Sequence, residues 1–481
     1  MKSSETFVHK DVGAGSVTIV GGGISGLATA YFLGKHGTRS TLIEKSNRLG
    51  GLIKTDLIEG CQLEAGPDSY IASKPAVTEL ARELGDLGNQ IIGSNDEARR
   101  IFVVRRGKLV PIPKGMVMMV PGQWTPALRS ELFSVKTKLR FLVETLSAPR
   151  KRTEDVSVEK FVDDHFGKEM LDYVTEPLLS GVYGGDPSNL SVESVLPRFL
   201  RYERVYGSLI RGLRHERSQS SRGNSAFLSF AGGMQTLIDS LTAASAAFMD
   251  VIYGEAAGIE RSDGRWLLKV GNNWTRTDQI VLACPAHVCS QLLENAEPTL
   301  ASKLAEIPYS SAILVTLAYE RSKLRHALDG FGFLVPRIER RNIAAATWVS
   351  TKFPSRAPIK TAVLRAFIVG KEAEQLLDAP SQSLADLVHE ELAKLMGLEQ
   401  LPLSHTVNLW PRSMPQYVVG HGLRRLHIAQ ALDHCPGLYL VGSAYDGVGV
   451  PDCVQMAKQT AKSILTERSV MRTTVESRIK N

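Results

Sequence analysis

Two glycine-rich segments, one near each end of the chain, have the residue types and spacing of a dinucleotide-binding site. The first, residues 16–27, runs from the apolar stretch Val17–Val20 into glycines at G-x-G-x-x-G spacing and then into a helix-like pattern. The second, residues 437–450, has the same order of apolar run, glycines and helix pattern. Ligands of doubly wound sheets bind at the carboxyl ends of the strands. The two segments therefore predict one extended cofactor that the chain contacts twice.

The first segment supplies groups suited to phosphates and a ribose. Gly21 permits a tight turn, Gly23 lets the backbone approach a pyrophosphate, and Gly26 lets the helix pack against the strand. The helix N-terminus adds free N–H groups and a partial positive charge. Glu44 ends the next apolar run, eighteen residues after Gly26, where an acid can accept hydrogen bonds from ribose hydroxyls. A glycine-rich turn beside a surface glutamate remains the alternative.

The residues after Glu44 favour a flavin over a nicotinamide. Lys45 and Arg48 are followed at once by the pair Gly50 and Gly51. A nicotinamide dehydrogenase does not need a second glycine pair here, whereas an FAD protein does, because the chain must pass close beside the isoalloxazine. The cofactor we predict is FAD. This arrangement resembles the amine oxidase and porphyrinogen oxidase superfamily of FAD flavoproteins.

Composition is that of a large enzyme with more than one domain: 481 residues, 43% hydrophobic and 22% charged. The net charge of +7 lies in short basic clusters without interleaved aromatic residues, so we expect no nucleic-acid partner. An acidic small molecule or an anionic membrane surface fits these clusters better, and a solvated basic face is the plainer alternative. The five cysteines form no C-x-x-C pair, which indicates a reducing compartment.

Several other classes are disfavoured by pattern. The eleven histidines form no close Cys/His set, so no metal is predicted. The uncharged stretch Val12–Gly34 contains the glycine fingerprint and is not expected to span a membrane. Met1–Asp11 has no apolar stretch of its own, so we expect no signal peptide and a cytoplasmic location. Lys114–Trp124 combines apolar residues with flanking basic ones and predicts a peripheral membrane contact or channel mouth, with ordinary core packing as the alternative.

The alternation of patterns predicts an α/β protein: a Rossmann-like FAD-binding domain with a mixed-sheet substrate domain and a helical insertion. Strand signals fade after about residue 95 and return in the second half of the chain, so the FAD-binding domain is expected to form from separate segments. The expected divisions are the FAD-binding domain in 1–70, 211–295 and 425–466, the substrate domain in 71–95 and 296–424, the helical insertion in 96–210, and a flexible tail in 467–481.

Three further motifs give a closer resemblance. Glu176–Pro187, with the sequence EPLLSGVYGGDP, resembles the middle signature of the oxygen-dependent protoporphyrinogen oxidases, although a turn cluster remains the alternative. Glu64–Ser69 and Ser413–His421 are similar to two other motifs of that family. The GPDS form is closest to the bacterial branch, whose members include coproporphyrinogen III oxidases. With the flavin segments, the resemblance covers most of the chain.

The resemblance implies FAD contacts from Gly21, Gly22, Gly23, Ile24, Ser25, Gly26, Glu44, Lys45, Arg48, Gly50, Gly51, Gly66, Pro67, Asp68, Ser69, Ala257, Ser443, Val448, Gly449 and Val450. Ala257 stands where the family more often has a valine, a difference of little weight if only its backbone is used. Lys74 matches a basic residue facing a substrate propionate, or is a surface lysine. Gly181 lies in the middle motif, and Leu334 and Trp348 are expected as apolar walls for a tetrapyrrole or as core residues.

The implied activity is oxidation of protoporphyrinogen IX or coproporphyrinogen III to the porphyrin in haem biosynthesis. Six electrons leave in three steps, with O2 as acceptor and H2O2 as by-product, and the protein holds the substrate against the cofactor. We therefore predict no catalytic acid or base, and we interpret Tyr417 and His421 as structural. A dimer is implied by the same resemblance. Two alternatives stay open: an FAD amine oxidase or carotenoid-type desaturase, and a non-enzymatic escort protein on the flavin scaffold.

Overall fold

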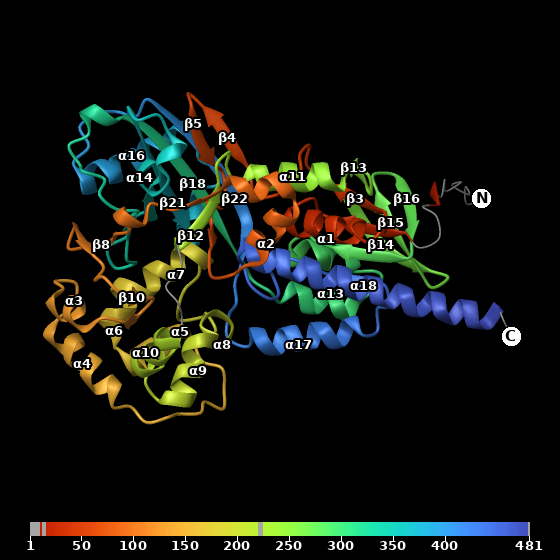
Figure 1. Cartoon of the computed structure of the whole chain (residues 1–481), viewed down its shortest axis with the longest axis horizontal. Helices are drawn as coiled ribbons and strands as arrows, with labels where there is room; N and C mark the ends of the chain where they lie inside the picture. The colour runs from red at the N-terminus through yellow and green to blue at the C-terminus, as the bar shows by residue number, and fades with distance from the viewer. Residues whose placement is uncertain (1–9, 12–15, 220–224, 480–481) are drawn as a thin grey trace.

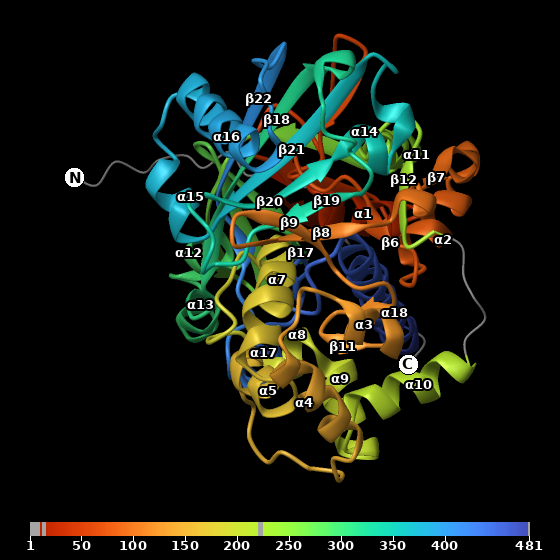
Figure 2. The same ribbon diagram turned by 90° about the vertical axis from the view of Figure 1, so that its left-hand side faces the viewer.

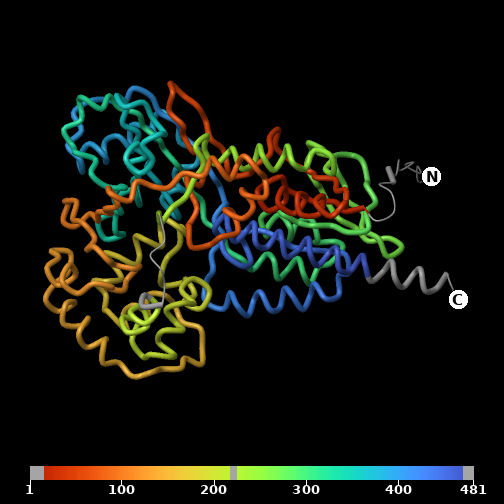
Figure 3. The backbone as a smooth tube through the Cα atoms, in the orientation of Figure 1, coloured from red at the N-terminus to blue at the C-terminus, as the bar shows by residue number. Residues whose placement is uncertain are grey.

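A computed structural model describes residues 10–11, 16–219 and 225–479 (Figure 1). The C-terminal part of the last helix, α18 (Val450–Ile479), lies at one end of the elongated molecule. The other end divides into a lobe built on a large sheet and a lobe built of helices, and the backbone tube of Figure 3 shows how the chain passes between them. The expected α/β class with mixed sheet and helices is confirmed.

The parallel sheet gathers strands from three distant parts of the sequence. Its order is β13-β3-β2-β17-β23, with every neighbouring pair parallel. All four residues of β2 and of β17 are buried, as expected for central strands covered on both faces. The strands are β2 (Val17–Val20), β3 (Ser40–Glu44), β13 (Met249–Tyr253), β17 (Gln279–Leu282) and β23 (Leu438–Leu440).

Helices and a small sheet cover this parallel sheet. Helix α1 (Ile24–Gly34) packs against α11 (Gln235–Ser245) and along α18 (Val450–Ile479). The small sheet has the order β1-β16-β15-β14, and α12 packs on β14 and against α13. The remaining bounds here are β1 (Lys10–Asp11), β14 (Ala256–Ser262), β15 (Arg265–Val270), β16 (Asn273–Thr277), α12 (Ala286–Leu293), α13 (Pro298–Ala305) and α17 (His421–Leu432).

The large sheet is mixed and has the order β22-β18-β21-β20-β19-β8-β9, of which only the β19–β8 pair is parallel. Figure 2 shows α14, α15 and α16 around it. The bounds are β8 (Ile101–Arg105), β9 (Lys108–Pro111), β18 (Tyr309–Glu320), β19 (Gly332–Leu334), β20 (Ile343–Trp348), β21 (Thr361–Val369), β22 (Ser404–Pro415), η4 (Arg321–Lys323), α14 (Val349–Lys352), η5 (Pro354–Arg356), α15 (Lys371–Leu376) and α16 (Ser381–Met396).

Residues 101–111 correct one expectation. The sequence analysis assigned them to the helical insertion, but they form β8 and β9 at the edge of the large sheet. The β-branched and aromatic run Ile101–Val104 is a strand-forming sequence, and its pairing with β19, more than 200 residues away, was not evident from local pattern.

The helical lobe has its own core of buried aliphatic and aromatic side chains, including Phe141, Phe161 and Phe166. Its elements are β10 (Met116–Val117), β11 (Val120–Pro121), α3 (Trp124–Arg129), α4 (Val135–Thr145), α5 (Val158–His165), α6 (Lys168–Met170), the π-helix η3 (Leu171–Thr175), α7 (Glu176–Tyr183), α8 (Val192–Val195), α9 (Pro197–Tyr206) and α10 (Leu209–Gln219). Met119 is fully buried and Met118 half-buried, so much of Lys114–Trp124 packs into this core.

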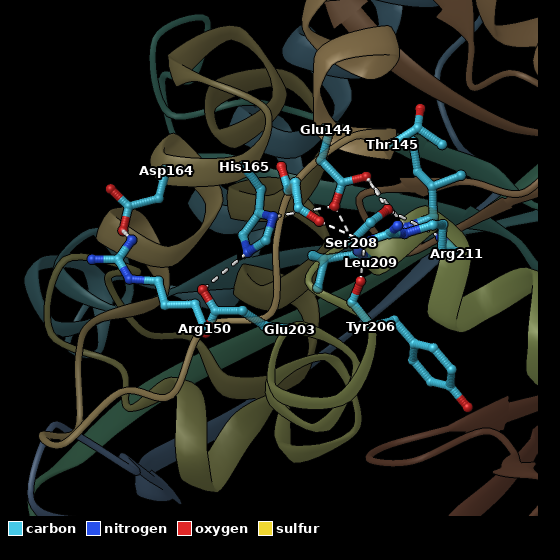
Figure 4. A network of polar contacts seen from close by, with 12 residues as sticks. Glu144, Thr145, Arg150, Asp164, His165, Glu203, Tyr206, Ser208, Leu209 and Arg211 are labelled. Atoms are coloured by element: carbon cyan, nitrogen blue, oxygen red, sulfur yellow. Dashed lines mark hydrogen bonds and ion pairs between the residues drawn. The ribbon is translucent and has the colours of Figure 1, made fainter.

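A buried ionic cluster, which we call the insertion cluster, ties four helices of this lobe together (Figure 4). The ring nitrogens of His165 on α5 lie 3.2 Å from Glu144 on α4 and 3.2 Å from Glu203 on α9. Glu144 also accepts hydrogen bonds from the Ser208 hydroxyl at 2.8 Å and from the Leu209 amide at the start of α10. Arg152 completes the cluster, with Glu203 at 2.7 Å and Asp164 at 3.0 Å.

Short elements connect these regions. The hairpin β4–β5 and the sheet β6-β12-β7 lie between the two larger sheets. Their bounds are β4 (Thr55–Ile58), β5 (Cys61–Glu64), β6 (Tyr70–Ile71), β7 (Ile91–Gly93), β12 (Phe227–Phe230), α2 (Ala76–Glu83), η1 (Gly85–Gln90) and η2 (Asp96–Ala98).

The C-terminal segment also differs from expectation. Helix α18 continues through Ile479, so the segment expected as a flexible tail is helical over 467–479. The sequence there has no glycine or proline to end a helix. Residues 480–481 and Met1–His9 of the N-terminal prediction lie outside the described residues. Among the described helices, none combines the length and apolar character needed to cross a bilayer.

Candidate flavin site

The two N-terminal glycine loops lie against each other. Gly23 and Gly50 form an isolated parallel bridge, and the Gly50 amide donates to the Gly22 carbonyl at 2.8 Å. Arg48 shapes the second loop from within, because its guanidinium donates to the carbonyls of Leu49 at 3.1 Å, Ile53 at 3.0 Å and Gly51. The predicted cofactor residues Gly21–Gly26 and Arg48–Gly51 are therefore brought together. Arg48 organises the loop backbone in this arrangement.

Space around the glycines distinguishes their roles. A Cβ on Gly26 would lie 2.0 Å from the Gly21 carbonyl oxygen, so Gly26 is needed for the helix to pass the strand end. A Cβ on Gly23 would meet only the Gly51 Cα, at 4.0 Å. Gly23 thus borders open space at the start of α1, whose N-cap has no side-chain hydrogen bond. This combination of room and uncapped N–H groups fits a pyrophosphate.

Glu44, the predicted ribose contact, is the last residue of β3 and lies beside the first glycine loop. One carboxylate oxygen accepts from the Gly22 amide at 2.6 Å and the other from the Ser46 amide at 2.7 Å. Its neighbour Lys45 points outward and pairs with Glu255 at 2.6 Å, with both side chains mostly exposed. The carboxylate therefore supports the glycine loop at the carboxyl end of β3, and Lys45 lies at the rim.

The C-terminal segment reaches the same edge of the parallel sheet. β23 pairs with β17, and the chain then turns through residues 441–449 into α18. The Gly449 amide donates to Asp452 at 3.2 Å, at the N-terminus of that helix. Ser443 and Val448–Val450 are half-buried. The predicted flavin-end residues therefore lie at the carboxyl ends of the strands that carry the N-terminal loop, as the ligand rule for such sheets requires.

Residues Gly66–Ser69 rest on a second buried ionic cluster, the junction cluster, made of Glu64, Asp68, Lys352, Arg356 and Arg365. The Lys352 ammonium lies 3.0 Å from both Asp68 oxygens, Arg365 lies 3.3 Å from Asp68, and Arg356 lies 2.9 Å from Glu64. The cluster joins the β4–β5 hairpin region to the large sheet. Four of its members, Glu64, Asp68, Arg356 and Arg365, line a cavity together with Thr316.

The charges in the junction cluster act on its two acids differently. Burial alone would raise the pKa of Asp68, but Lys352 and Arg365 outweigh it and hold that pKa well below its usual range. Burial raises the pKa of Glu64 in spite of Arg356. Because the Asp68 carboxylate is engaged by Lys352, Arg365 and Ser69, its predicted cofactor role is indirect in this structure, through the shape of the Gly66–Ser69 turn.

The two motifs of the closer resemblance lie against each other. Gln416 donates to the Tyr183 carbonyl, and a Cβ on Gly185 would lie 2.1 Å from the Gln416 side-chain oxygen. The rings of Tyr183 and Tyr417 have centroids 6.0 Å apart. Glu176 anchors the middle motif through Arg340 at 2.7 Å. Two segments separated by more than 200 residues therefore pack into one surface, which we call the motif wall. A cluster of turn residues alone would not explain these long-range contacts.

The residues predicted to bind substrate have different surroundings. Gly181 is exposed on α7, with nothing within 4 Å of where its Cβ would be. Lys74 is half exposed and pairs with Asp452 at 2.7 Å. Leu334 is half-buried beside the helical core. Trp348 is fully buried, with its ring 5.5 Å from that of Phe102, so the structure corrects the expected pocket wall to a core residue.

Ala257 is an exposed residue of β14 at a register shift between Ala256 and Gly258, so it has no partner in that ladder. This leaves its backbone accessible, as the predicted adenine contact would need.

Sequence reasoning missed the cations of the junction cluster. Arg365 stands alone in the apolar strand TAVLRAFIV, and Lys352 in WVSTKF. A single cation in a buried strand or helix needs a buried partner of opposite charge. This pattern in the sequence could have indicated a buried ion pair. Tyr417 and His421 were noticed, but their role depends on contacts with residues 443–447 that only the fold reveals.

Comparison with known proteins agrees with this geometry. Residues 24–465 match the family described as flavin containing amine oxidoreductase. The coproporphyrinogen III oxidase of Bacillus subtilis is 31% identical over 94% of this chain and 98% of its own length. The protoporphyrinogen oxidase of Bos taurus is 29% identical, over 94% and 98%.

Solved structures give the same result. One named as a protoporphyrinogen oxidase from Exiguobacterium sp. 255-15 is 31% identical, with a TM-score of 0.84 over 94% of this chain and 99% of that one. Putrescine oxidase, 18% identical with a TM-score of 0.68 over 94% of this chain and 99% of its own, shares the fold. The chain therefore belongs to the flavin-containing amine oxidoreductase family, which confirms the predicted FAD cofactor and oxidoreductase class.

Proposed function

We propose that the protein oxidises a porphyrinogen to the porphyrin in haem biosynthesis, with coproporphyrinogen III preferred over protoporphyrinogen IX and with O2 as the electron acceptor. The observation that carries the proposal is near full-length similarity, at 30–31% identity, to bacterial proteins named coproporphyrinogen III oxidase. The joining of the middle and C-terminal motifs into the motif wall beside the flavin-end loop supports it.

In this proposal the side chains of the protein bind the porphyrinogen and orient it against the cofactor. Bound FAD supplies the two-electron chemistry at each step. The open face of α7 at Gly181 leaves room for a flat substrate, and half-buried Leu334 is an apolar contact for it. Lys74, bridged to Asp452 and half exposed, is the proposed partner of one propionate. No side chain is assigned as a general acid or base.

Steady-state assays on both porphyrinogens test the substrate. We expect porphyrin fluorescence to appear with either, faster with coproporphyrinogen III, and hydrogen peroxide to form in proportion. Lys74→Ala should raise KM several-fold with a smaller change in kcat, because one partly solvated charge pair is worth about 1 kcal/mol. Oxidation of an amine but of neither porphyrinogen would overturn the proposal.

The flavin assignment has a separate test in the glycine loop. Gly23→Val should abolish FAD retention while the protein still folds, because the new side chain enters open space that the pyrophosphate would fill. Ala243→Val, at an exposed position of α11, is the control, since it places the same valine side chain on the surface outside the glycine loops. A yellow Gly23→Val protein would contradict the site.

We also propose a peripheral contact with an anionic membrane, made by α4 and not by Lys114–Trp124. Positions spaced along one face of α4 and just beyond it are exposed and apolar: Val135 (73%), Leu139 (56%), Leu142 (49%), Val143 (66%) and Leu146 (84%). Lys136, Lys138 and Arg140 on the same helix, with Arg150 and Lys151 after it, supply positive charge beside this apolar stripe. Such a combination suits an interfacial helix.

Co-sedimentation with vesicles tests the membrane contact. The triple variant Leu139→Ser, Leu142→Ser, Val143→Ser should lose binding to vesicles containing anionic phospholipid. The control, Leu401→Ser with Leu403→Ser, removes leucines of similar exposure from the sheet lobe and should bind as wild type. Equal binding by both variants would refute the contact. Light scattering on the wild-type protein without vesicles tests separately whether it forms the dimer that the resemblance implies.

A further inference from the structure

Two stacked aromatic rings contact the loop between β23 and α18. Tyr417, which is 2% exposed, and His421, which is 1% exposed, lie parallel within 13° with centroids 4.0 Å apart. Tyr417 follows the end of β22, and His421 begins α17. Neither ring contacts solvent to any extent, so their polar atoms must find partners inside the protein.

Those partners are main-chain atoms of the loop. The Tyr417 hydroxyl donates to the Ser443 carbonyl at 2.7 Å and accepts from the Gly447 amide at 2.8 Å. The Nε2 atom of His421 lies 3.3 Å from the Tyr445 carbonyl. Three contacts thus fix both ends and the middle of a five-residue stretch, residues 443–447.

The protonation state of His421 is consistent with this geometry. Burial lowers the pKa of His421 to about 4, so the ring is neutral near pH 7. A neutral ring can donate from one nitrogen, and the Tyr445 carbonyl can only accept, so the proton lies on Nε2. The Nδ1 atom is buried without a hydrogen-bond partner in the described part of the chain, which leaves the loop contact as the polar role of this ring.

These contacts add to others of this loop, in which Ala444 and Tyr445 are buried and Asp446 pairs with Arg425. Gly442 precedes the stretch and Gly447 ends it, both with positive φ, at +142° and +114°. Glycine at these positions permits the sharp path but adds conformational freedom. The loop lies at the carboxyl ends of the parallel strands, where the cofactor binds.

We propose that Tyr417 and His421 form a two-ring clamp that positions residues 443–447 against the flavin. They are positioning residues, acting through the loop and not on the substrate. The inference rests on the flavin site and is independent of which substrate the enzyme oxidises.

The test is Tyr417→Phe in the full-length FAD-loaded protein, which keeps the stacked ring and removes two hydrogen bonds. FAD release, followed by the fluorescence of free FAD, should be about tenfold faster, because two hydrogen bonds that hold the loop are lost. The flavin absorbance spectrum and reduction potential should also shift. A purely structural tyrosine would lower the melting temperature without changing the spectrum or potential of the flavin that remains bound.

Tyr439→Phe is the matched control. Its hydroxyl also makes two hydrogen bonds, to Glu467 and from Gln279, but from β23 and away from the loop. We expect FAD release and spectrum as in wild type. Equal effects of the two variants, or no effect of Tyr417→Phe, would overturn the clamp.

His421→Phe gives an independent measurement if Tyr417→Phe does not fold. It keeps an aromatic ring and removes one longer contact, so FAD release should accelerate by a smaller factor than for Tyr417→Phe. Unchanged release and an unchanged flavin spectrum in a folded His421→Phe protein would overturn the role of the histidine and with it the clamp.

Discussion

The insertion cluster and the junction cluster both bury charged side chains, but they pair their carboxylates with different cationic groups. In the junction cluster three cations, Lys352, Arg356 and Arg365, face two carboxylates. In the insertion cluster three carboxylates face one buried arginine, Arg152, and His165, so its balance depends on whether that ring carries a proton. The cations of the junction cluster are lysine and arginine side chains, whereas the insertion cluster includes an imidazole, the side chain that ordinarily titrates nearest to neutral pH.

The pKa of His165 expresses this dependence. Burial opposes the charged ring, but the hydrogen bonds to Glu144 and Glu203 outweigh burial and raise the pKa. The same contact with His165, together with Arg152, lowers the pKa of Glu203 against the effect of burial. Protonation of His165 therefore stabilises the insertion cluster, whereas the carboxylates of the junction cluster are paired with lysine and arginine side chains.

The largest effect should come from breaking the junction cluster. Asp68→Ala leaves the Lys352 ammonium buried opposite no carboxylate, which should lower the free energy of unfolding by about 3–5 kcal/mol. Urea denaturation measures it. Lys45→Ala, which removes one side of the exposed pair with Glu255, is the control and should change stability by less than about 1 kcal/mol. Comparable losses in both variants would contradict the distinction we draw between buried and exposed pairs.

A pH series sharpens the comparison. Because the folded-state pKa of His165 is raised, its contribution is fully present below about pH 6.5, the unfolded value, and is lost as pH rises through the folded value. The free energy of unfolding falls by about 1.4 kcal/mol for each tenfold by which the folded state binds this proton more tightly than the unfolded state. Unfolding of the wild type, measured from pH 5.5 to 9, should show this decline.

His165→Gln should flatten the decline, since glutamine keeps hydrogen-bonding capacity without titrating. Asp68 shifts in the opposite direction, so its contribution is lost only in acid and leaves this window unaffected. A wild-type slope retained in His165→Gln would show that another group is responsible.

The smallest effect should be Ser208→Ala, which removes the hydrogen bond to Glu144 and the one accepted from the Arg211 amide, and leaves the ionic contacts in place. We expect a loss of about 1 kcal/mol in urea denaturation. Ser463→Ala, on an exposed face of α18, removes a 3.3 Å bond to a helix carbonyl and should be near neutral. A loss above about 3 kcal/mol for Ser208→Ala would mean that the serine, and not the ion pairs, holds the cluster together.

Sequence reasoning succeeded where the determinants are local. The turn at Gly21, the strand Ser40–Glu44 and the loop at Gly50 follow from residue type and short spacing, and the structure has all three. The parallel sheet and the mixed sheet were expected from the same patterns. The interpretation failed where a partner far along the chain decides the outcome: β8 is a strand because β19 pairs with it, and Lys352 is buried because Asp68, 284 residues away, meets it.

Burial could not be assigned from composition either. Trp348 and Met119 belong to apolar segments that suit a pocket wall or a surface patch equally well, and only the packing of the lobes places both in cores. The opposite holds for α4. Its apolar residues are spaced like those of a helix packed into a core, but in the structure they are exposed.

The order of strands in the parallel sheet has a consequence for synthesis of the protein. The edge strand β23 and helix α18, which packs along α1, leave the ribosome more than 400 residues after the glycine loop that they complete. The N-terminal loop must therefore wait for the synthesis of these two elements before its cofactor site is complete. A product that ends before Leu438 would lack half of the site and remain colourless. Yellow colour in the purified protein would then report a chain translated through β23 into α18 as well as a folded enzyme.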